Sequence, residues 1–76
     1  MSGQIPEMQP VTSSHVVAVG YDESEQALYV QWKDGRTSMY DNVPPLIASN
    51  LQNAQSVGAA FNETIKGKYQ HRYIEQ

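Results

Sequence analysis

The sequence contains no cysteine, which excludes disulfide bonds, thiolate zinc sites and cysteine nucleophiles. It also lacks an apolar run long enough for a membrane-spanning helix. Its first ten residues, MSGQIPEMQP, have neither the basic start nor the apolar middle of a secretory signal. We therefore expect a cytoplasmic protein with no membrane partner.

Positive charge is also scarce, since five Lys and Arg residues face eight Asp and Glu residues and the formal net charge is −3. A dedicated binder of duplex nucleic acid usually carries excess Lys and Arg, so duplex DNA is not an expected partner. The charges are segregated, which matters more than their sum. The acidic residues Asp22, Glu23 and Glu25 share one loop, whereas Lys66, Lys68, His71 and Arg72 all fall near the C-terminus.

The chain of 76 residues is near the lower limit for a domain that folds without metal or disulfides. Its core must be thin, and association between identical chains would add stability. Residues 1–12 contain two prolines and no periodic apolar pattern, which predicts a flexible N-terminal arm. Residues 13–76 then form a single domain.

Three segments rich in Val, Tyr and Trp predict β-strands: HVVAVGY, QALYVQWK and RTSMYD, all within residues 15–41. Asp34-Gly35 between the last two suits a two-residue type I′ turn, because both central residues need a positive φ. This turn predicts three cross-strand pairs: Trp32 with Thr37, Val30 with Met39, and Tyr29 with Tyr40.

Pairing of Leu28 with Gly20 and of Val30 with Ala18 extends this register to the first strand. One face of the sheet then carries Val16, Ala18, Leu28, Val30, Trp32 and Met39. The other carries Val17, Val19, Tyr21, Tyr29 and Tyr40. Both faces are apolar, so whichever face the helices leave uncovered is a candidate interface. A homo-oligomer would cover it with one symmetric contact.

The second half of the chain predicts two helices. VPPLIASNLQNA, residues 43–54, has prolines suited to a first turn and an apolar stripe of Leu46, Ile47, Leu51 and Ala54. In the next segment Ser56 is a good N-cap and Gly67 a good stop. Its stripe is Val57, Ala60, Phe61, Ile65 and Tyr69. The predicted fold is α+β: a three-stranded antiparallel β-meander followed by two α-helices packed on one face.

An ordered set of residues runs through nearly the whole folded region: Ser14, VGYD at 19–22, Leu28, Val30, Trp32, Gly35, Tyr40, VP at 43–44, Ala54, Ser56, Gly58, Phe61, Ile65, Lys66 and Tyr69. This spacing resembles the KTSC domain family, small domains named for their likeness to a C-terminal extension of some lysyl-tRNA synthetases. Two positions differ, because Ser38 stands where the family often has an aromatic residue and Trp32 where Phe is more usual.

The resemblance implies a β-meander followed by two helices, occurring as single-domain bacterial or phage proteins or as an appendage. It implies no established reaction. The synthetase connection suggests nucleic acid or nucleotide as the ligand class.

No set of residues meets the requirements of catalysis, so we expect no enzyme, no cofactor and no metal. Ser13, Ser14 and His15 are consecutive, but successive strand side chains alternate between faces, so Ser14 and His15 do not form a nucleophile and its base. His15 and His71 have no third ligand nearby in the sequence. The acidic loop lacks the ligand spacing of a calcium site and is more simply a solvated turn.

We instead expect a small non-catalytic binding module whose ligand is a nucleotide or an RNA end, and which acts by sequestering a small nucleotide. The first turn from Ser56 to Gly58 presents amide groups that suit an anion. The basic segment after it offers cations with interleaved tyrosines. The predicted ligand-binding residues are Ser56, Gly58, Lys66, Lys68 and Arg72.

Simpler roles compete with each of these assignments. Ser56 is explained by helix capping alone, and Gly58 by close packing of its helix on the preceding one. The cations interact favourably with a helix dipole if they lie in its last turn. The alternative function is a protein–protein interaction or structural module that uses the exposed apolar sheet face.

Overall fold

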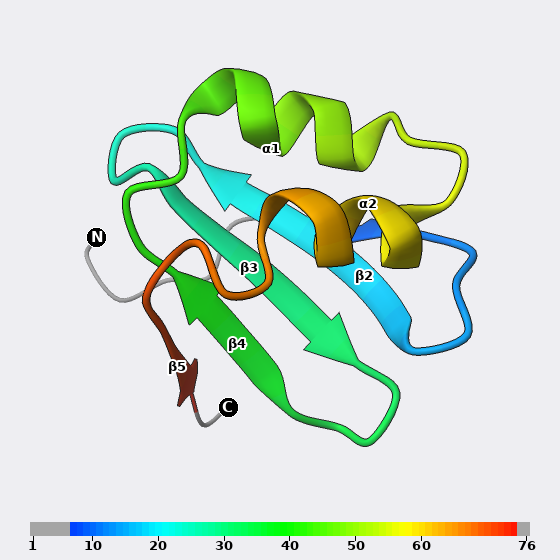
Figure 1. Ribbon diagram of the computed structural model, residues 1–76. Coiled ribbons are helices and arrows are strands. Elements are labelled where there is room, and N and C mark those ends of the chain that lie inside the picture. Colours follow the sequence, from blue (N-terminus) through cyan, green and yellow to red (C-terminus); the bar gives the residue numbers. More distant parts are fainter. Residues whose placement is uncertain (1–6, 75–76) are drawn as a thin grey trace.

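The computed structural model describes residues 7–74 and contains a five-stranded antiparallel sheet with two helices (Figure 1). The strands are β1 (Gln9–Pro10), β2 (Val16–Asp22), β3 (Ala27–Trp32), β4 (Thr37–Tyr40) and β5 (His71–Ile74), adjacent in that order. The helices α1 (Pro45–Gln52) and α2 (Val57–Thr64) connect β4 to β5. The α+β class is confirmed, whereas the expected number of three strands was wrong.

The two additional strands lie at the edges of the sheet and are short. β1 comes from the segment expected to be a flexible arm, where Gln9 and Pro10 pair with Val19 and Ala18. Proline is tolerated on an edge strand because it does not need to donate to a second neighbour. Residues 1–6 of that arm lie outside the described residues. β5 escaped prediction because HRYI is mostly polar and exposed.

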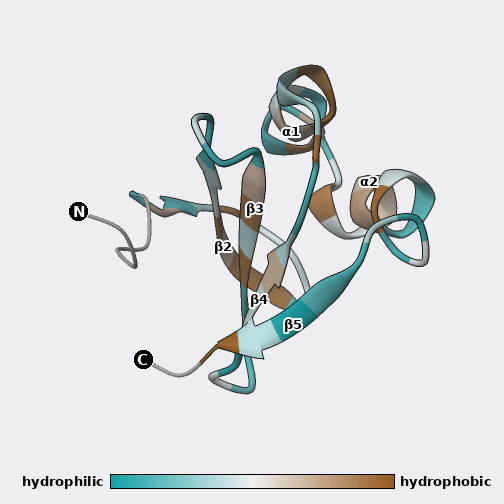
Figure 2. Ribbon diagram, turned by 90° about the vertical axis from the view of Figure 1, so that its left-hand side faces the viewer, coloured by the Kyte–Doolittle hydropathy of each residue, from teal (hydrophilic) through white to brown (hydrophobic). Residues whose placement is uncertain are grey.

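Both helices lie on the same side of the sheet, which Figure 2 shows edge-on. α1 begins directly after Pro44, as the prolines predicted, and buries Ala48 and Leu51. The predicted stripe of α1 was wrong at Leu46, whose side chain is 70% exposed. Within residues 7–74, neither helix has the length and apolar character needed to cross a membrane.

The cap predicted for α2 is confirmed, because the Ser56 hydroxyl accepts a hydrogen bond from the Ala59 amide at 3.4 Å. The helix ends at Thr64, and a turn containing Gly67, with φ of 77°, leads into β5. The competing explanation, in which the cations lie in the last turn of this helix, is therefore wrong.

The β3–β4 turn contains three residues, Lys33-Asp34-Gly35, where the sequence predicted two. The Trp32 amide donates to the Arg36 carbonyl at 2.8 Å, and Gly35 has φ of 98°. A three-residue hairpin loop that ends in a residue with positive φ forms a bulge of this kind. The additional residue shifts the register by one, so the predicted pairs were wrong. The observed pairs are Leu28–Tyr40, Tyr29–Met39, Val30–Ser38 and Gln31–Thr37.

The register between β2 and β3 is likewise shifted from the prediction over most of its length. Val16 pairs with Trp32, but an irregularity between Val16 and Ala18 moves the following residues by one position. Leu28 consequently pairs with Tyr21 and not with the predicted Gly20. Because side chains alternate along a strand, one step of register moves each affected residue to the other face.

The helices and the sheet enclose one main core made of Val16, Val19, Leu28, Val30, Tyr40, Val43, Ala48, Leu51, Val57, Phe61 and Ile65. The prediction that Ala18 and Met39 share a face with Val16, Leu28 and Val30 was wrong. Met39 belongs to a second buried cluster on the back of the sheet, and the register places Ala18 there too.

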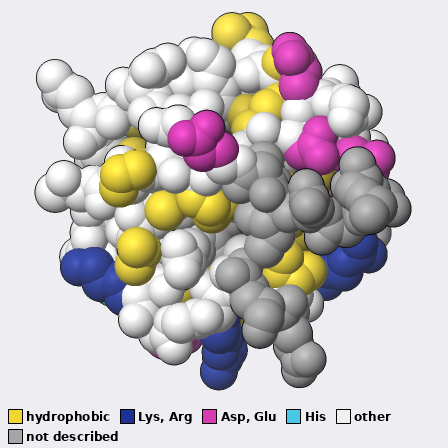
Figure 3. Space-filling model, turned by 180° about the vertical axis from the view of Figure 1, so that it is seen from behind, with side chains coloured by type: hydrophobic (Ala, Val, Ile, Leu, Met, Phe, Trp, Pro, Cys, Tyr) yellow, Lys and Arg dark blue, Asp and Glu magenta, His cyan; other side chains and the backbone are white. Residues whose placement is uncertain are grey.

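The residues predicted to form an exposed interface do not share one face. Val19 and Tyr40 are buried in the main core, and Tyr21 packs against it. Tyr29 lies on the back in the cluster of Ala27, Tyr29 and Met39, against which Met8 and Ile74 pack. Val17 remains 41% exposed. The hydrophobic side chains visible on the back lie in separate patches (Figure 3).

The hairpin geometry predicts the cost of changing Gly35. No atom lies within 4 Å of a Cβ built there, so Gly35→Ala introduces only backbone strain at positive φ. We expect the free energy of unfolding to fall by about 1 kcal/mol. Urea denaturation followed by circular dichroism measures it.

Gly35→Asn is the matched control, because Asn tolerates positive φ and should lose less stability than Ala. Equal stability of the Ala variant and the unmodified chain would contradict the observed turn.

Candidate functional site

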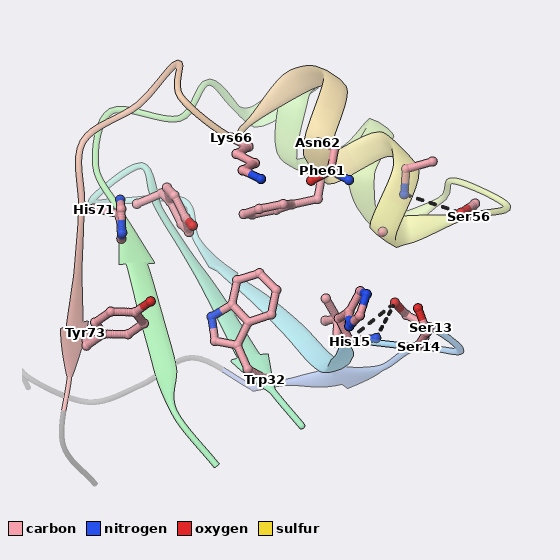
Figure 4. Close-up of a pocket in the computed structure, with 14 residues that line it drawn as sticks. Ser13, Ser14, His15, Trp32, Ser56, Phe61, Asn62, Lys66, His71 and Tyr73 are labelled. Carbon is pink, nitrogen blue, oxygen red and sulfur yellow. Dashed lines mark hydrogen bonds between the residues drawn. The ribbon is translucent and has the colours of Figure 1, made fainter. Parts of the chain in front are cut away.

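A cleft of about 710 Å³ lies between α2 and the strands β3, β4 and β5 (Figure 4). This volume falls within the range of about 300–1,000 Å³ common for small-molecule sites. Four segments far apart in the sequence line it: Ser13–Val16, Trp32 and Tyr40 on β3 and β4, the α2 region from Ser56 to Lys66, and His71 and Tyr73 on β5. It is the candidate site because it combines aromatic rings, hydroxyls and cations.

Three aromatic rings form its base. The Phe61 ring of α2 contacts Trp32 edge-on with centroids 5.2 Å apart, and Tyr40 edge-on at 5.4 Å. The Trp32 indole Nε1 donates a hydrogen bond to the Ser38 hydroxyl at 2.8 Å, which fixes the orientation of the ring. The cleft therefore has a rigid aromatic base held from both the helix and the sheet.

Strand β5 supplies one wall. Because β5 side chains alternate, His71 and Tyr73 face the cleft, and His71 stacks on Tyr40 with centroids 4.9 Å apart. The Tyr73 ring is 57% exposed and lies edge-on to His71 at 5.9 Å. The Arg36 guanidinium lies 5.3 Å from the Tyr73 ring centroid. An aromatic ring so exposed beside a cleft offers area for stacking.

The start of α2 forms another part of the rim. A Cβ on Gly58 would lie 3.3 Å from the Ser13 hydroxyl, so glycine permits the helix to approach the segment before β2. The Ser13 hydroxyl in turn accepts from the amides of His15, at 3.3 Å, and Val16, at 3.4 Å. The alternative that Gly58 makes room for packing was right in kind, but its contact is with Ser13 and not with the preceding helix.

Charge distinguishes this cleft from a hollow on another part of the described surface. Lys66 and two histidines, His15 and His71, line it, and none of its lining residues is acidic. A hollow elsewhere, beside β1 and the end of α1, is lined by Glu7 and Glu23 and by no Lys or Arg. Although the chain carries a net charge of −3, the cleft thus favours an anion.

Burial raises the pKa of Tyr40, the Tyr73 hydroxyl adds to the rise, and a hydrogen bond to Ser38 opposes it. Tyr40 therefore stays neutral at physiological pH and adds no negative charge to the cleft. Burial likewise raises the pKa of Tyr21 and of Tyr29, and acidic groups of the β2–β3 loop contribute. Within residues 7–74, no group of three or more His, Asp or Glu side chains is placed to hold a metal ion.

The structure brings together three of the five residues predicted to bind a ligand: Ser56, Gly58 and Lys66. The Lys66 amide donates to the Phe61 carbonyl at 2.9 Å, which anchors this lysine at the end of α2. Lys68 is not among the lining residues. Arg72 faces the back of the sheet, where its Nη2 lies 4.0 Å from the Met39 sulfur.

The sequence reasoning missed Trp32, Asn62 and the serine-histidine segment as parts of this site. It also treated His71 and Arg72 as one basic group, although strand alternation separates them. HRYI has no alternation of apolar and polar residues, so the sequence carried no signal that places His71 and Tyr73 together.

Comparison with known proteins confirms the resemblance noted in the sequence. The KTSC domain family model matches residues 12–69. A protein from Tsukamurella paurometabola is 40% identical over 62 residues, which cover 82% of this chain and 92% of that protein. A crystal structure of a KTSC domain protein from Yersinia pestis has a TM-score of 0.85 and 37% identity, covering 91% of this chain and 97% of that one.

A lysine–tRNA ligase from Nostoc punctiforme is 35% identical over 54 residues, which are 71% of this chain but 10% of the ligase. The similarity to the ligase is thus confined to a small part of it. The family match ends at Tyr69, so β5, with its two cleft side chains, follows the matched segment.

The Trp32–Ser38 hydrogen bond generates a stability prediction. Ser38 is 1% exposed, so Ser38→Ala leaves the indole N–H without this partner. We expect the free energy of unfolding to fall by about 1 kcal/mol, measured by urea denaturation with far-ultraviolet circular dichroism.

Trp32→Phe provides the matched background, because it removes the donor. In that background Ser38→Ala should cost much less, giving a double-mutant coupling of about 1 kcal/mol. Identical costs in the two backgrounds would show that the hydrogen bond contributes nothing.

Proposed function

This chain belongs to the KTSC domain family, and from that membership together with its cleft we propose that it is a small non-catalytic module that binds a nucleotide or an RNA end. The observation that carries the proposal is the composition of the cleft, in which aromatic rings and a lysine occur together without an acidic residue. Nucleotides combine an aromatic base with an anionic phosphate, so such a lining complements both parts.

The aromatic side of the cleft suits the base. Tyr73 and Trp32 present ring area that is held in place by His71, Phe61 and Ser38. Stacking of a base on such rings contributes about 1–3 kcal/mol per base and tolerates any base identity. This feature supports a nucleotide over a simple anion such as phosphate.

The opposite side suits the phosphate. Lys66 extends over the cleft from the end of α2, and Ser13 and Ser14 lie across from it (Figure 4). Gly58, in the first turn of α2, also lines the cleft. The first amides of a helix lack intrahelical partners, so the start of α2 adds hydrogen-bond donors at the end of the helix opposite to the lysine. Sequestration of a small nucleotide needs only such binding, without any reacting group.

Thermal unfolding in the presence of mononucleotides, cyclic nucleotides and short RNAs tests the proposal. A ligand of the folded state present at about 100 times its dissociation constant adds about 2.7 kcal/mol, which raises the melting temperature of a domain of this size by roughly 10–20 °C. We expect at least one member of the panel to do so, and Lys66→Ala to reduce its affinity by about fivefold.

Lys68→Ala and Arg72→Ala are matched controls, because each removes a cation of the same segment that does not line the cleft. We expect both to keep the affinity of the unmodified chain. No stabilisation by any nucleotide, or equal losses in all three variants, would contradict binding in this cleft.

A protein-interaction module remains the alternative, with a second copy of the chain as the simplest partner. Of the residues predicted to form the sheet interface, Val17 is 41% exposed and would take part in such a contact. Light scattering at high protein concentration measures the solution mass, and this alternative predicts an oligomer. A monomer would contradict self-association.

A further inference from the structure

We propose that the cleft is one half of a longer groove whose ligand unit is a dinucleotide, two nucleosides joined by a phosphodiester. This inference rests on the proposed function and specifies the class of ligand. Its basis is a second hollow of about 480 Å³, lined by Ser14, His15, Trp32, Lys33, Asp34 and Tyr73.

The two hollows are continuous. Four residues line both of them: Ser14, His15, Trp32 and Tyr73. In Figure 4 the Trp32 ring lies between His15 on one side and Tyr73 on the other. The groove therefore passes over the indole ring from the end of α2 to the β3–β4 hairpin, and a ligand in the first hollow can continue into the second.

Each hollow contains one lysine. Lys66 lines the first and Lys33 lines the second, and neither lines both. The aromatic residues Trp32 and Tyr73 lie at the junction. Two cations separated by aromatic surface match the alternation of phosphates and bases along a nucleic-acid strand, whereas a mononucleotide would occupy only one of the two lysines.

The one acidic residue of the groove is already partnered. Asp34 accepts a hydrogen bond from the Arg36 amide at 2.9 Å, and its other carboxylate oxygen lies 3.6 Å from the Arg36 Nε. Arg36 also lies beside the Tyr73 ring. The charge of Asp34 is thus partly offset on the hairpin, and the second hollow still accepts a phosphate next to Lys33.

The indole ring is held in place at the junction. Its N–H donates a hydrogen bond to Ser38 on the sheet side, and the ring contacts Phe61 edge-on on the helix side. A ring fixed in this way gives up little conformational freedom when a base stacks on it. Trp32 is also the only tryptophan in the chain, so its fluorescence reports directly on occupation of the groove.

The test compares adenosine 5′-monophosphate with the 5′-phosphorylated dinucleotide pApA, by calorimetry and by Trp32 fluorescence. We expect pApA to bind about tenfold more tightly than the mononucleotide, because it adds one stacked base and one phosphate contact. Lys33→Ala should lower the affinity for pApA by about fivefold and leave that for the mononucleotide unchanged. Lys66→Ala should weaken both.

The outcomes separate the two proposals. If the two ligands bind equally well, or if Lys33→Ala leaves pApA binding intact, the dinucleotide inference is overturned and the cleft remains a mononucleotide site. If neither ligand binds at millimolar concentration while the protein is folded, both proposals are overturned. Lys68→Ala should match the unmodified chain in every titration.

A hexaadenylate with a 5′ phosphate distinguishes whether the bound dinucleotide is the end of an RNA or a free molecule. Affinity equal to that of pApA supports an RNA end as the ligand, and loss of binding supports a free dinucleotide. If pApA and the hexaadenylate both bind more weakly than adenosine 5′-monophosphate, the longer groove is contradicted.

Discussion

The edge-on contacts of Phe61 with Trp32 and Tyr40 are the interaction on which the rest of the structure depends. They join α2 to β3 and β4, which are adjacent in the sheet but distant from α2 in the sequence. A helix of eight residues is marginal in water, so its stability comes from packing. The same rings form the base of the cleft, so they belong both to the packing of the core and to the candidate site.

The elements with strong local signals were predictable from the sequence. Ser56 is the N-cap that its position indicated, and the prolines begin α1. The register was not predictable from Asp34-Gly35, because the same dipeptide fits a loop of two residues and one of three. In the structure Lys33 joins the loop, so Arg36 pairs with Trp32 and not with Lys33. That single additional loop residue moved Met39 and Tyr40 to faces opposite from those expected.

The site was predictable only in part, for a related reason. Gly58 and Lys66 could be assigned because Gly58 lies in the first turn of a helix with a clear N-cap and Lys66 lies just beyond the end of that helix. The β5 contribution could not, since a strand of four mostly exposed residues has no apolar pattern, and its pairing with β4 depends on the chain reversing at Gly67. Trp32 and Ser38, the two positions at which the sequence was expected to depart from the family pattern, are hydrogen-bonded partners. The larger ring requires an acceptor, and the small serine supplies it.

The central claim is that the groove over Trp32, and not the back of the sheet, is the ligand-binding surface. The most direct measurement is a ¹⁵N–¹H chemical-shift titration with pApA. We expect the signals of the Trp32 indole N–H and of the Gly58 and Tyr73 amides to shift together, while the amide signals of Tyr29 and Met39 stay in place. Shifts confined to Tyr29 and Met39, with the indole signal unmoved, would contradict it.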